Sequence, residues 1–118
     1  MKHQILKSKI HRCRVTDKNI NYEGSITIDR ELMDAAGLLT YEIVDVFDIN
    51  NGSRFSTYVI EGKKGSGDII LNGAAARLVE KDDLIIIVAS TVLETEEAVN
   101  FHPKIVHVDD KTNKIKKT

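Results

Sequence analysis

The 118-residue chain has no tryptophan, a single proline and a single cysteine, and aromatic residues make up only 5% of it. One cysteine cannot form an internal disulfide, which suits a reducing compartment. The longest strongly apolar run, residues 84–89, is far too short to cross a bilayer, and the charged N-terminal residues do not resemble a secretion signal. A net charge of −1 argues against general attraction to nucleic acid or membranes. We therefore expect a cytoplasmic protein that binds neither.

The length is that of one domain, and the apolar pattern predicts many short strands and two small helices. The strands are expected at 7–16, 25–28, 41–50, 54–61, 68–71, 84–91 and 104–108, and the helices at 30–36 and 74–79. Asp29 is a good N-cap for the first helix, and Gly37 ends it. Asn51-Gly52 is a strong hairpin signal. This pattern is typical of a compact barrel, although it does not fix the topology.

Three local predictions concern the ends of the chain. On a period of two, Lys9, His11, Cys13 and Val15 share one face of the first strand. The segment 17–19 is expected to be a turn. The lysine-rich tail, 111–118, is expected to be disordered or frayed.

The bond between Gly24 and Ser25 is the most informative feature of the sequence. A serine hydroxyl can attack the carbonyl carbon just before it and turn the amide into an ester. Glycine at position 24 favours this attack because it lacks a Cβ, so it reaches backbone angles that other residues resist. Elimination from the ester, followed by hydrolysis, leaves a pyruvoyl group. Gly-Ser pairs are usually ordinary turns, and the chain has two others, at 52–53 and 65–66, so other motifs must support this interpretation.

Further motifs occur in a characteristic order between residues 9 and 90. They are Lys9-Ile10-His11-Arg12, Val15-Thr16, Tyr22-Glu23-Gly24-Ser25, Asp34-Ala35-Ala36-Gly37-Leu38, Asn51-Gly52, Arg54-Phe55-Ser56-Thr57-Tyr58, Asn72-Gly73-Ala74-Ala75-Ala76 and Asp83-Leu84-Ile85-Ile86-Ile87. Together they make the sequence resemble the pyruvoyl-dependent L-aspartate α-decarboxylases, which make β-alanine for pantothenate and coenzyme A biosynthesis.

The resemblance implies a mainly β fold, a six-stranded double-psi β-barrel with small capping helices. It implies one self-processing domain, 1–118, a zymogen that cuts itself between Gly24 and Ser25 into a β chain (1–24) and an α chain (25–118). The α-amino group of L-aspartate would form a Schiff base with the covalent pyruvoyl group derived from Ser25, and CO2 would leave. The resemblance also implies a homotetramer with active sites between neighbouring subunits, and some relatives need a maturation factor.

Two residues besides Ser25 carry the expected chemistry. By resemblance, Thr57 stabilises the oxyanion during the cut and contacts substrate. Tyr58 is the expected proton donor, because a phenol keeps its proton at neutral pH. Each has a plainer interpretation, as a strand residue that packs on its neighbours.

The substrate has two carboxylates, and the one that remains needs a cation. Arg54 suits this role because a guanidinium grips a carboxylate with two hydrogen bonds, and Lys9 is a second cation. Arg54 and Tyr58 share a strand face but are about 13 Å apart along it. Both reach one substrate only if the strand bends or if they serve sites in different subunits, and the resemblance favours the second arrangement.

Other residues support this expected site. His11 lies on the same face as Lys9, and Tyr22 is expected to hold the cleavage loop. By resemblance, Asn72 lies beside the pyruvoyl, and Gly73, Ala74 and Ala75 bind substrate; small residues there let a ligand approach the backbone.

The sequence gives less support to other functions. The four histidines are scattered without ligand spacing, so we expect no metal. A serine hydrolase would need a G-x-S-x-G elbow, which the sequence around Ser25 lacks. The main alternative is a double-psi barrel that is not cut and serves as a binding or assembly module.

Overall fold

The computed structural model describes residues 1–117, which are mainly β. The strands are β1 (Lys2–Arg14), β2 (Asp17–Asn19), β3 (Ser25–Asp29), β4 (Ile43–Asp48), β5 (Arg54–Gly62), β6 (Ile69–Asn72), β7 (Leu84–Glu94) and β8 (Lys104–His107). The helical segments are α1 (Arg30–Ala36), the 3-10 helix η1 (Gly73–Leu78) and α2 (Thr95–Ala98).

The strands form a sheet that closes on itself. Its order is β2-β6-β3-β5-β4-β7-β1-β8, and β2, which follows β1 almost directly along the chain, pairs with β6 at the far end of that order. Between β1 and β2, the backbone N–H of Thr16 donates to the carbonyl of Ile69 at 2.8 Å, and that of Val15 donates to Asp83 at 2.9 Å. Counting β1 with β2 as one strand and β8 as an addition along β1, the described chain forms a six-stranded barrel.

The barrel combines two kinds of strand pairing. β3 runs parallel to β5, and β2 runs parallel to β6, whereas β3–β6, β4–β5, β4–β7 and β1–β7 are antiparallel. The predicted mainly β barrel with small helices is therefore confirmed, and the mixed pairing is consistent with the expected double-psi topology.

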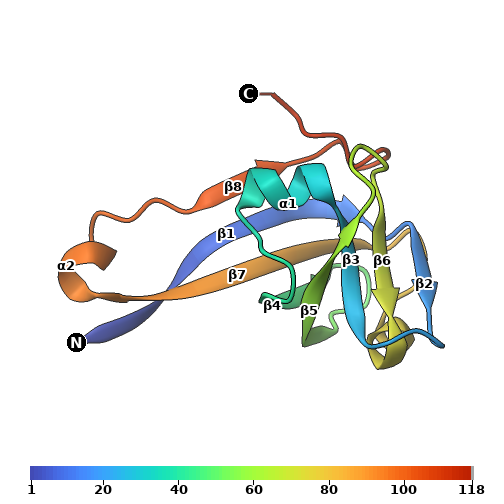
Figure 1. Cartoon of the computed structure of the whole chain (residues 1–118), viewed down its shortest axis with the longest axis horizontal. Helices are drawn as coiled ribbons and strands as arrows, with labels where there is room; N and C mark the ends of the chain where they lie inside the picture. Colours follow the sequence, from blue (N-terminus) through green and yellow to red (C-terminus); the bar gives the residue numbers. More distant parts are fainter. Residues whose placement is uncertain (118) are drawn as a thin grey trace.

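β1 and β7 continue beyond the barrel as a two-stranded arm that ends at α2 (Figure 1). At its tip Lys2 pairs with Glu94, and the Nε2 atom of His3 lies 2.8 Å from the hydroxyl of Thr95. The predicted strands were too short here, and α2 was not predicted. The tip residues are largely exposed, so their side chains leave no apolar pattern in the sequence.

The core lies inside the barrel and under α1. Its fully buried large side chains come from alternate positions of the strands and from one stripe of the helix, as the two periods require. They are Ile10, Val15, Ile26, Ile28, Leu32, Met33, Val44, Val46, Ile69, Leu71, Ile85 and Ile87.

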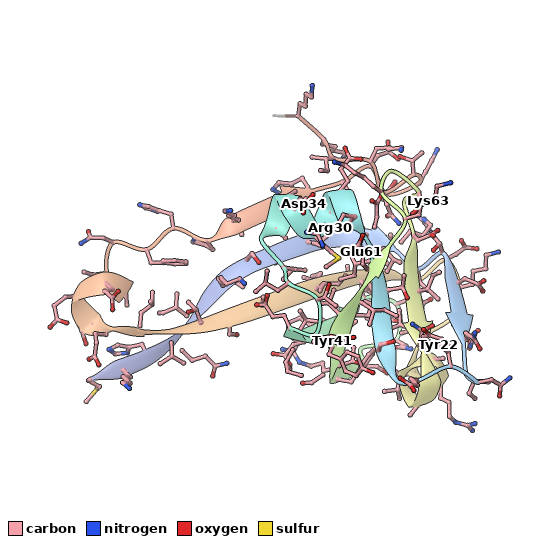
Figure 2. The ribbon with its side chains drawn as sticks, viewed as in Figure 1. Tyr22, Arg30, Asp34, Tyr41, Glu61 and Lys63 are labelled. Carbon is pink, nitrogen blue, oxygen red and sulfur yellow. The ribbon has the colours of Figure 1, made fainter. Side chains whose placement is uncertain are left out.

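The first helix has the predicted bounds and caps. The Asp29 carboxylate accepts from the backbone N–H of Glu31 at 2.8 Å, and Gly37 ends the helix in the left-handed region at φ 70°. On the solvent side Arg30 contacts Asp34 at 3.0 Å and Glu61 at 3.2 Å, which joins α1 to β5 (Figure 2). Exposed pairs of this kind contribute little stability, so the caps and the buried stripe hold the helix.

A bulge changes the expected face pattern of β1. The register with β7 shifts between Ile10 and Cys13, and Arg12 lies in the left-handed region at φ 60°. Ile10 and Cys13 are both fully buried, whereas His11 is half-buried. The prediction that His11 and Cys13 share a face is therefore wrong, because the extra residue of the bulge reverses the alternation.

The segment 17–19 is the strand β2 and not a turn. Its three residues are stabilised by parallel pairing with Ile70, Leu71 and Asn72 of β6, a partner distant in sequence. The polar side chains of 17–19 favoured a turn, and a window of a few residues contains no sign of that partner.

The C-terminal segment, predicted to be disordered or frayed, is held against the barrel over its described part. Asn113 is 2% exposed; its side-chain N–H groups donate to the carbonyls of Arg14 and Gly67, both at 2.8 Å, and its carbonyl accepts from the Arg14 N–H at 2.7 Å. Ile115 forms a bridge with Val108. The prediction is wrong here because a buried amide, which apolar patterning does not detect, anchors the segment; residue 118 lies outside the described residues.

Candidate active site

Ser25 is the first residue of β3 and is 1% exposed. Its hydroxyl donates to the carbonyl of Glu23 at 3.0 Å and accepts from the Asn72 amide at 3.0 Å. The same amide nitrogen also contacts the Thr27 hydroxyl at 3.0 Å. Asn72 is directly opposite Ser25 in the antiparallel β3–β6 pair. The barrel therefore holds the predicted nucleophile in place through a neighbouring strand.

Gly24 has ordinary backbone geometry in this uncut chain. It is not among the glycines with positive φ, and a Cβ built on it would meet no heavy atom within 4 Å in the described chain, its chain neighbours aside. The resting conformation therefore does not itself use the conformational freedom of glycine at position 24, and its expected help to the attack stays a prediction.

A pocket of about 400 Å³ opens beside Gly24, which we call the cleavage pocket. Its lining residues are Gly24, Phe55, Ser56, Thr57, Tyr58, Ala74, Ala75 and Leu78. Five of the predicted site residues thus meet at one place, and Ser25 directly follows one of them, Gly24, in the chain. Within residues 1–117 the lining contains no charged side chain, so the pocket alone offers no cation to a carboxylate.

The ring of Tyr58 lies against a second tyrosine. Its centroid is 6.0 Å from that of Tyr41, with an angle of 53° between the ring planes. Tyr41 is 72% exposed and lies in the left-handed region at φ 73°, a conformation that bulky residues rarely adopt. Figure 2 shows it beside β4 and β5. The predicted proton donor therefore has an aromatic neighbour that the sequence did not indicate.

Arg54 lies apart from this lining. It pairs with Phe47 across the β4–β5 hairpin, and its guanidinium carbon is 3.8 Å from the centre of the Phe47 ring. The side chain is exposed and forms no ion pair with the described residues. It is free to meet a carboxylate presented from outside this subunit.

Lys9 and His11 belong to another face of the barrel. His11 lines a pocket of about 350 Å³ with Arg12, His107, Val108, Asp110, Lys116 and Lys117, and its ring contacts His107 edge to face at 5.7 Å. Lys9 pairs with Val88 on one side and Ile105 on the other. Neither residue lines the cleavage pocket, so this chain by itself does not bring together all of the predicted site.

The electrostatics of this second pocket are cationic. Partial burial lowers the pKa of His11 below its usual value, and the positive charges of Lys9, His107 and Arg12 lower it further. The His11 Nδ1 atom is buried and has no hydrogen-bond partner among residues 1–117. We expect His11 to be neutral near pH 7, which would suit contact with a substrate or a water.

Sequence reasoning missed three contributors to the site. Thr27 shares the Asn72 amide with Ser25, and its position two residues after Ser25 on the same strand face was the available signal. Phe55 and Leu78 form apolar walls of the cleavage pocket; Phe55 was noted only as part of a motif.

Tyr22, which was predicted to hold the cleavage loop, is 53% exposed and lies beside the end of β6 (Figure 2). It precedes the Gly24–Ser25 bond by two residues.

Two further features of the described chain bear on other functions. Residues 1–117 contain no group of three or more histidine, cysteine or acidic side chains arranged to hold a metal ion. None of the helices in this range has the length and apolar character needed to cross a membrane.

Comparison with known proteins gives a consistent result. A family model described as aspartate decarboxylase matches residues 1–116. A relative from Campylobacter hominis is 62% identical over 91% of this chain and 92% of its own length. A relative from Caldicellulosiruptor saccharolyticus is 61% identical over 97% of this chain and 88% of its own length. A relative from Syntrophomonas wolfei is 58% identical over 96% of this chain and 96% of its own length. All three are named aspartate 1-decarboxylase.

Proposed function

Since the chain belongs to the aspartate decarboxylase family, it is a carboxy-lyase that acts on aspartate, and we propose that it does so through a pyruvoyl group made from its own Ser25. The products are β-alanine and CO2, and β-alanine serves pantothenate and coenzyme A biosynthesis. The observation that carries the proposal is the buried Ser25 hydroxyl, held at 3.0 Å by Asn72 beside a pocket lined by Gly24, Thr57 and Tyr58.

The first stage is the cut. The Ser25 hydroxyl attacks the carbonyl carbon of Gly24, the C–N bond breaks, and the chain is joined by an ester with a free amine on residue 25. Loss of the Cα proton then expels the Gly24 carboxylate and leaves a dehydroalanine, and water replaces its nitrogen, which departs as ammonia. Thr57, which lines the same pocket as Gly24, stabilises the developing oxyanion, a contribution of about 3 kcal/mol for a well-placed donor.

The second stage is turnover. When formed, the pyruvoyl group supplies an electron sink that accepts the charge left by the departing carboxylate. The residues fit such a group, because the Asn72 amide is a hydrogen-bond donor beside residue 25 and the neighbouring cleavage pocket has no charged side chain in its lining within residues 1–117. Tyr58 donates the proton that replaces the carboxylate. Ala74 and Ala75 let the substrate lie against the backbone of η1.

The missing cation supports an active site shared between subunits. The cleavage pocket has no charged lining within residues 1–117, yet the retained carboxylate of aspartate needs a cation. We propose that the protein is a homotetramer, in which Lys9, Arg54 and His11 of neighbouring copies complete each site. A cytoplasmic location suits the lone Cys13 thiol, which is buried. A maturation factor would speed the cut without changing its residues.

Denaturing mass analysis tests the proposal. We expect the purified protein to give two pieces, 1–24 and 25–118, the second with a pyruvoyl end that resists Edman sequencing. Ser25→Ala should stay in one piece and be inactive. Ser53→Ala, which alters the serine of another Gly-Ser pair, is the matched control and should cut normally.

Two results would count against the proposal. A wild-type chain that stays intact and still decarboxylates aspartate would exclude the pyruvoyl group as its source of activity. Labelling of Ser25 by a fluorophosphonate without any cut would indicate a serine hydrolase.

A further inference from the structure

Gly73 packs directly against the backbone of residues 22–24, the segment just before Ser25, which we call the cleavage loop. It is buried and lies at φ 66°, in the left-handed region. A Cβ built on Gly73 would lie 2.6 Å from the N atom of Gly24, 2.7 Å from its Cα and 2.9 Å from the carbonyl oxygen of Tyr22. All three are backbone atoms, which cannot rotate away as the end of a side chain can. The loop can take its observed position only because residue 73 has no side chain.

Asn72 and Gly73 together hold the two sides of the bond that is cut. Asn72 donates to the Ser25 hydroxyl at 3.0 Å, on the C-terminal side of the bond. Gly73 supports the backbone of Gly24 on the N-terminal side. Two consecutive residues at the junction of β6 and η1 therefore contact Gly24 and Ser25, where the chain enters β3, so their spacing sets the position of the bond relative to Asn72.

The requirement for glycine thus falls on position 73. A Cβ on Gly24 would meet no heavy atom within 4 Å in the described chain, its chain neighbours aside, whereas one on Gly73 would overlap the backbone of the loop. We propose that Gly73 is a positioning residue for self-cleavage, an inference that rests on the proposed function. Gly73 acts through its lack of a side chain, and this role is additional to the substrate contact expected of it.

The size of the effect follows from the contact distance. To move from 2.6 Å to the 3.4 Å of an ordinary contact, the loop must shift by about 0.8 Å (3.4 minus 2.6) away from Gly73. Ser25, one residue further along, would move relative to Asn72. Misplacement of reacting groups by about 1 Å can slow a reaction about a hundredfold. We therefore expect Gly73→Ala to cut about tenfold to hundredfold more slowly than the wild type.

Gly52→Ala is the matched control. Gly52 has nearly the same left-handed geometry, φ 77°, but a Cβ there would meet no heavy atom within 4 Å elsewhere in residues 1–117. Both substitutions place alanine in a strained backbone region, and only Gly73→Ala adds a clash with the cleavage loop. The difference in cutting rate between the two variants isolates that clash.

The experiment follows the loss of intact full-length chain by denaturing mass analysis. Each variant is also made with Ser25→Ala, which cannot be cut, to compare folding by thermal unfolding. We expect both uncut variants to fold, Gly52→Ala to cut within about twofold of the wild-type rate, and Gly73→Ala to cut at least about tenfold more slowly.

Three outcomes would overturn the inference. Equal cutting rates for Gly73→Ala and Gly52→Ala would show that the contact does not control the cut. Loss of folding in uncut Gly73→Ala, with uncut Gly52→Ala still folded, would show that the contact supports the fold and not the cut in particular. A wild-type chain that never cuts would refute this inference and the proposed function together, whereas the first two outcomes leave the proposed function standing.

Discussion

The carboxylate of Asp48 provides a test of the electrostatics of the β4–β5 turn. Asp48 ends β4 and is 3% exposed. One of its oxygens accepts from the backbone N–H groups of Asn50 and Asn51, at 2.8 and 3.2 Å, whereas the other is buried without a partner among residues 1–117. Burial, and after it the neighbouring Asp83 carboxylate, raises the pKa of Asp48 from 3.8 to about 6, against the lowering effect of the Asn51 and Asn50 N–H groups. The two carboxylates titrate together, and a proton on the pair removes a buried negative charge.

The sign of the pH dependence follows from this shift. The folded chain holds the proton more tightly than the unfolded chain, so the stabilisation is fully present below about pH 4 and is lost as the pH rises through about 6. A pKa raised from 3.8 to about 6 corresponds to about 3 kcal/mol over that range. This figure is an upper value, because the proton belongs to both carboxylates.

Asp48→Asn should remove this dependence. The amide oxygen can still accept from Asn50 and Asn51, and the neutral amide places no negative charge beside Asp83 at any pH. We expect the variant to gain up to about 3 kcal/mol in unfolding free energy at about pH 7.5 and only about 1 kcal/mol at about pH 4.5. Thermal and urea unfolding in a Ser25→Ala background, which keeps the chain in one piece, measure both values.

Asp17→Asn is the control, since it removes one negative charge from an exposed residue and should leave the pH dependence unchanged. The reasoning is refuted if Asp48→Asn keeps the wild-type slope of stability between these two pH values, or if it is less stable at the higher one.

The same turn is linked to the cleavage pocket, because the side-chain N–H of Asn51 donates to the carbonyl of Leu78 at 2.9 Å. A stabilised turn should therefore also hold that wall of the pocket more firmly.

Three further predictions test the site. Tyr58→Phe should cut normally but lose at least about a hundredfold in kcat; wild-type turnover would show that another group donates the proton. Lys9→Ala and Ser25→Ala, each inactive alone, should regain activity when refolded together, because a mixed assembly contains some intact sites; no recovery would contradict a site shared between subunits. Tyr41→Asn should raise thermal stability, since asparagine tolerates positive φ at about 1 kcal/mol less strain, with Tyr41→Phe unchanged; a lower melting temperature would show that the contact with Tyr58 outweighs the strain.

The parts of the fold that could be predicted are those with local causes. The caps of α1 depend on Asp29 and Gly37, each within a residue or two of the helix end, and the Asn51-Gly52 hairpin depends on its own turn residues. β2 and the anchor at Asn113 depend on partners about 50 residues or more away. A short sequence window contains no information about such partners, so both were predicted wrongly.

The site divides in the same way. The motifs identified Ser25, Thr57, Tyr58 and the segment from Asn72, and the barrel brings these together. The steric role of Gly73 could not be predicted. It depends on the distance of 2.6 Å between a Cβ built on Gly73 and the backbone N atom of Gly24, which lies far away in the sequence. Glycine is used in turns, in close contacts and beside ligands alike, so its identity alone does not distinguish these uses.

The distribution of charge suggests why cutting and turnover would depend on assembly in different ways. The groups proposed for the cut all come from one chain: Thr57 lines the neutral cleavage pocket, Asn72 holds the Ser25 hydroxyl, and Gly73 lies against Gly24. A neutral surrounding suits the attack of an uncharged hydroxyl on an amide, which needs only a local oxyanion donor. Binding aspartate instead needs a cation, and Lys9 lies on another face of the same barrel. On the proposed arrangement we therefore expect each chain to cut itself alone, at a rate independent of protein concentration, and turnover to require a second copy that brings its cations to the pocket.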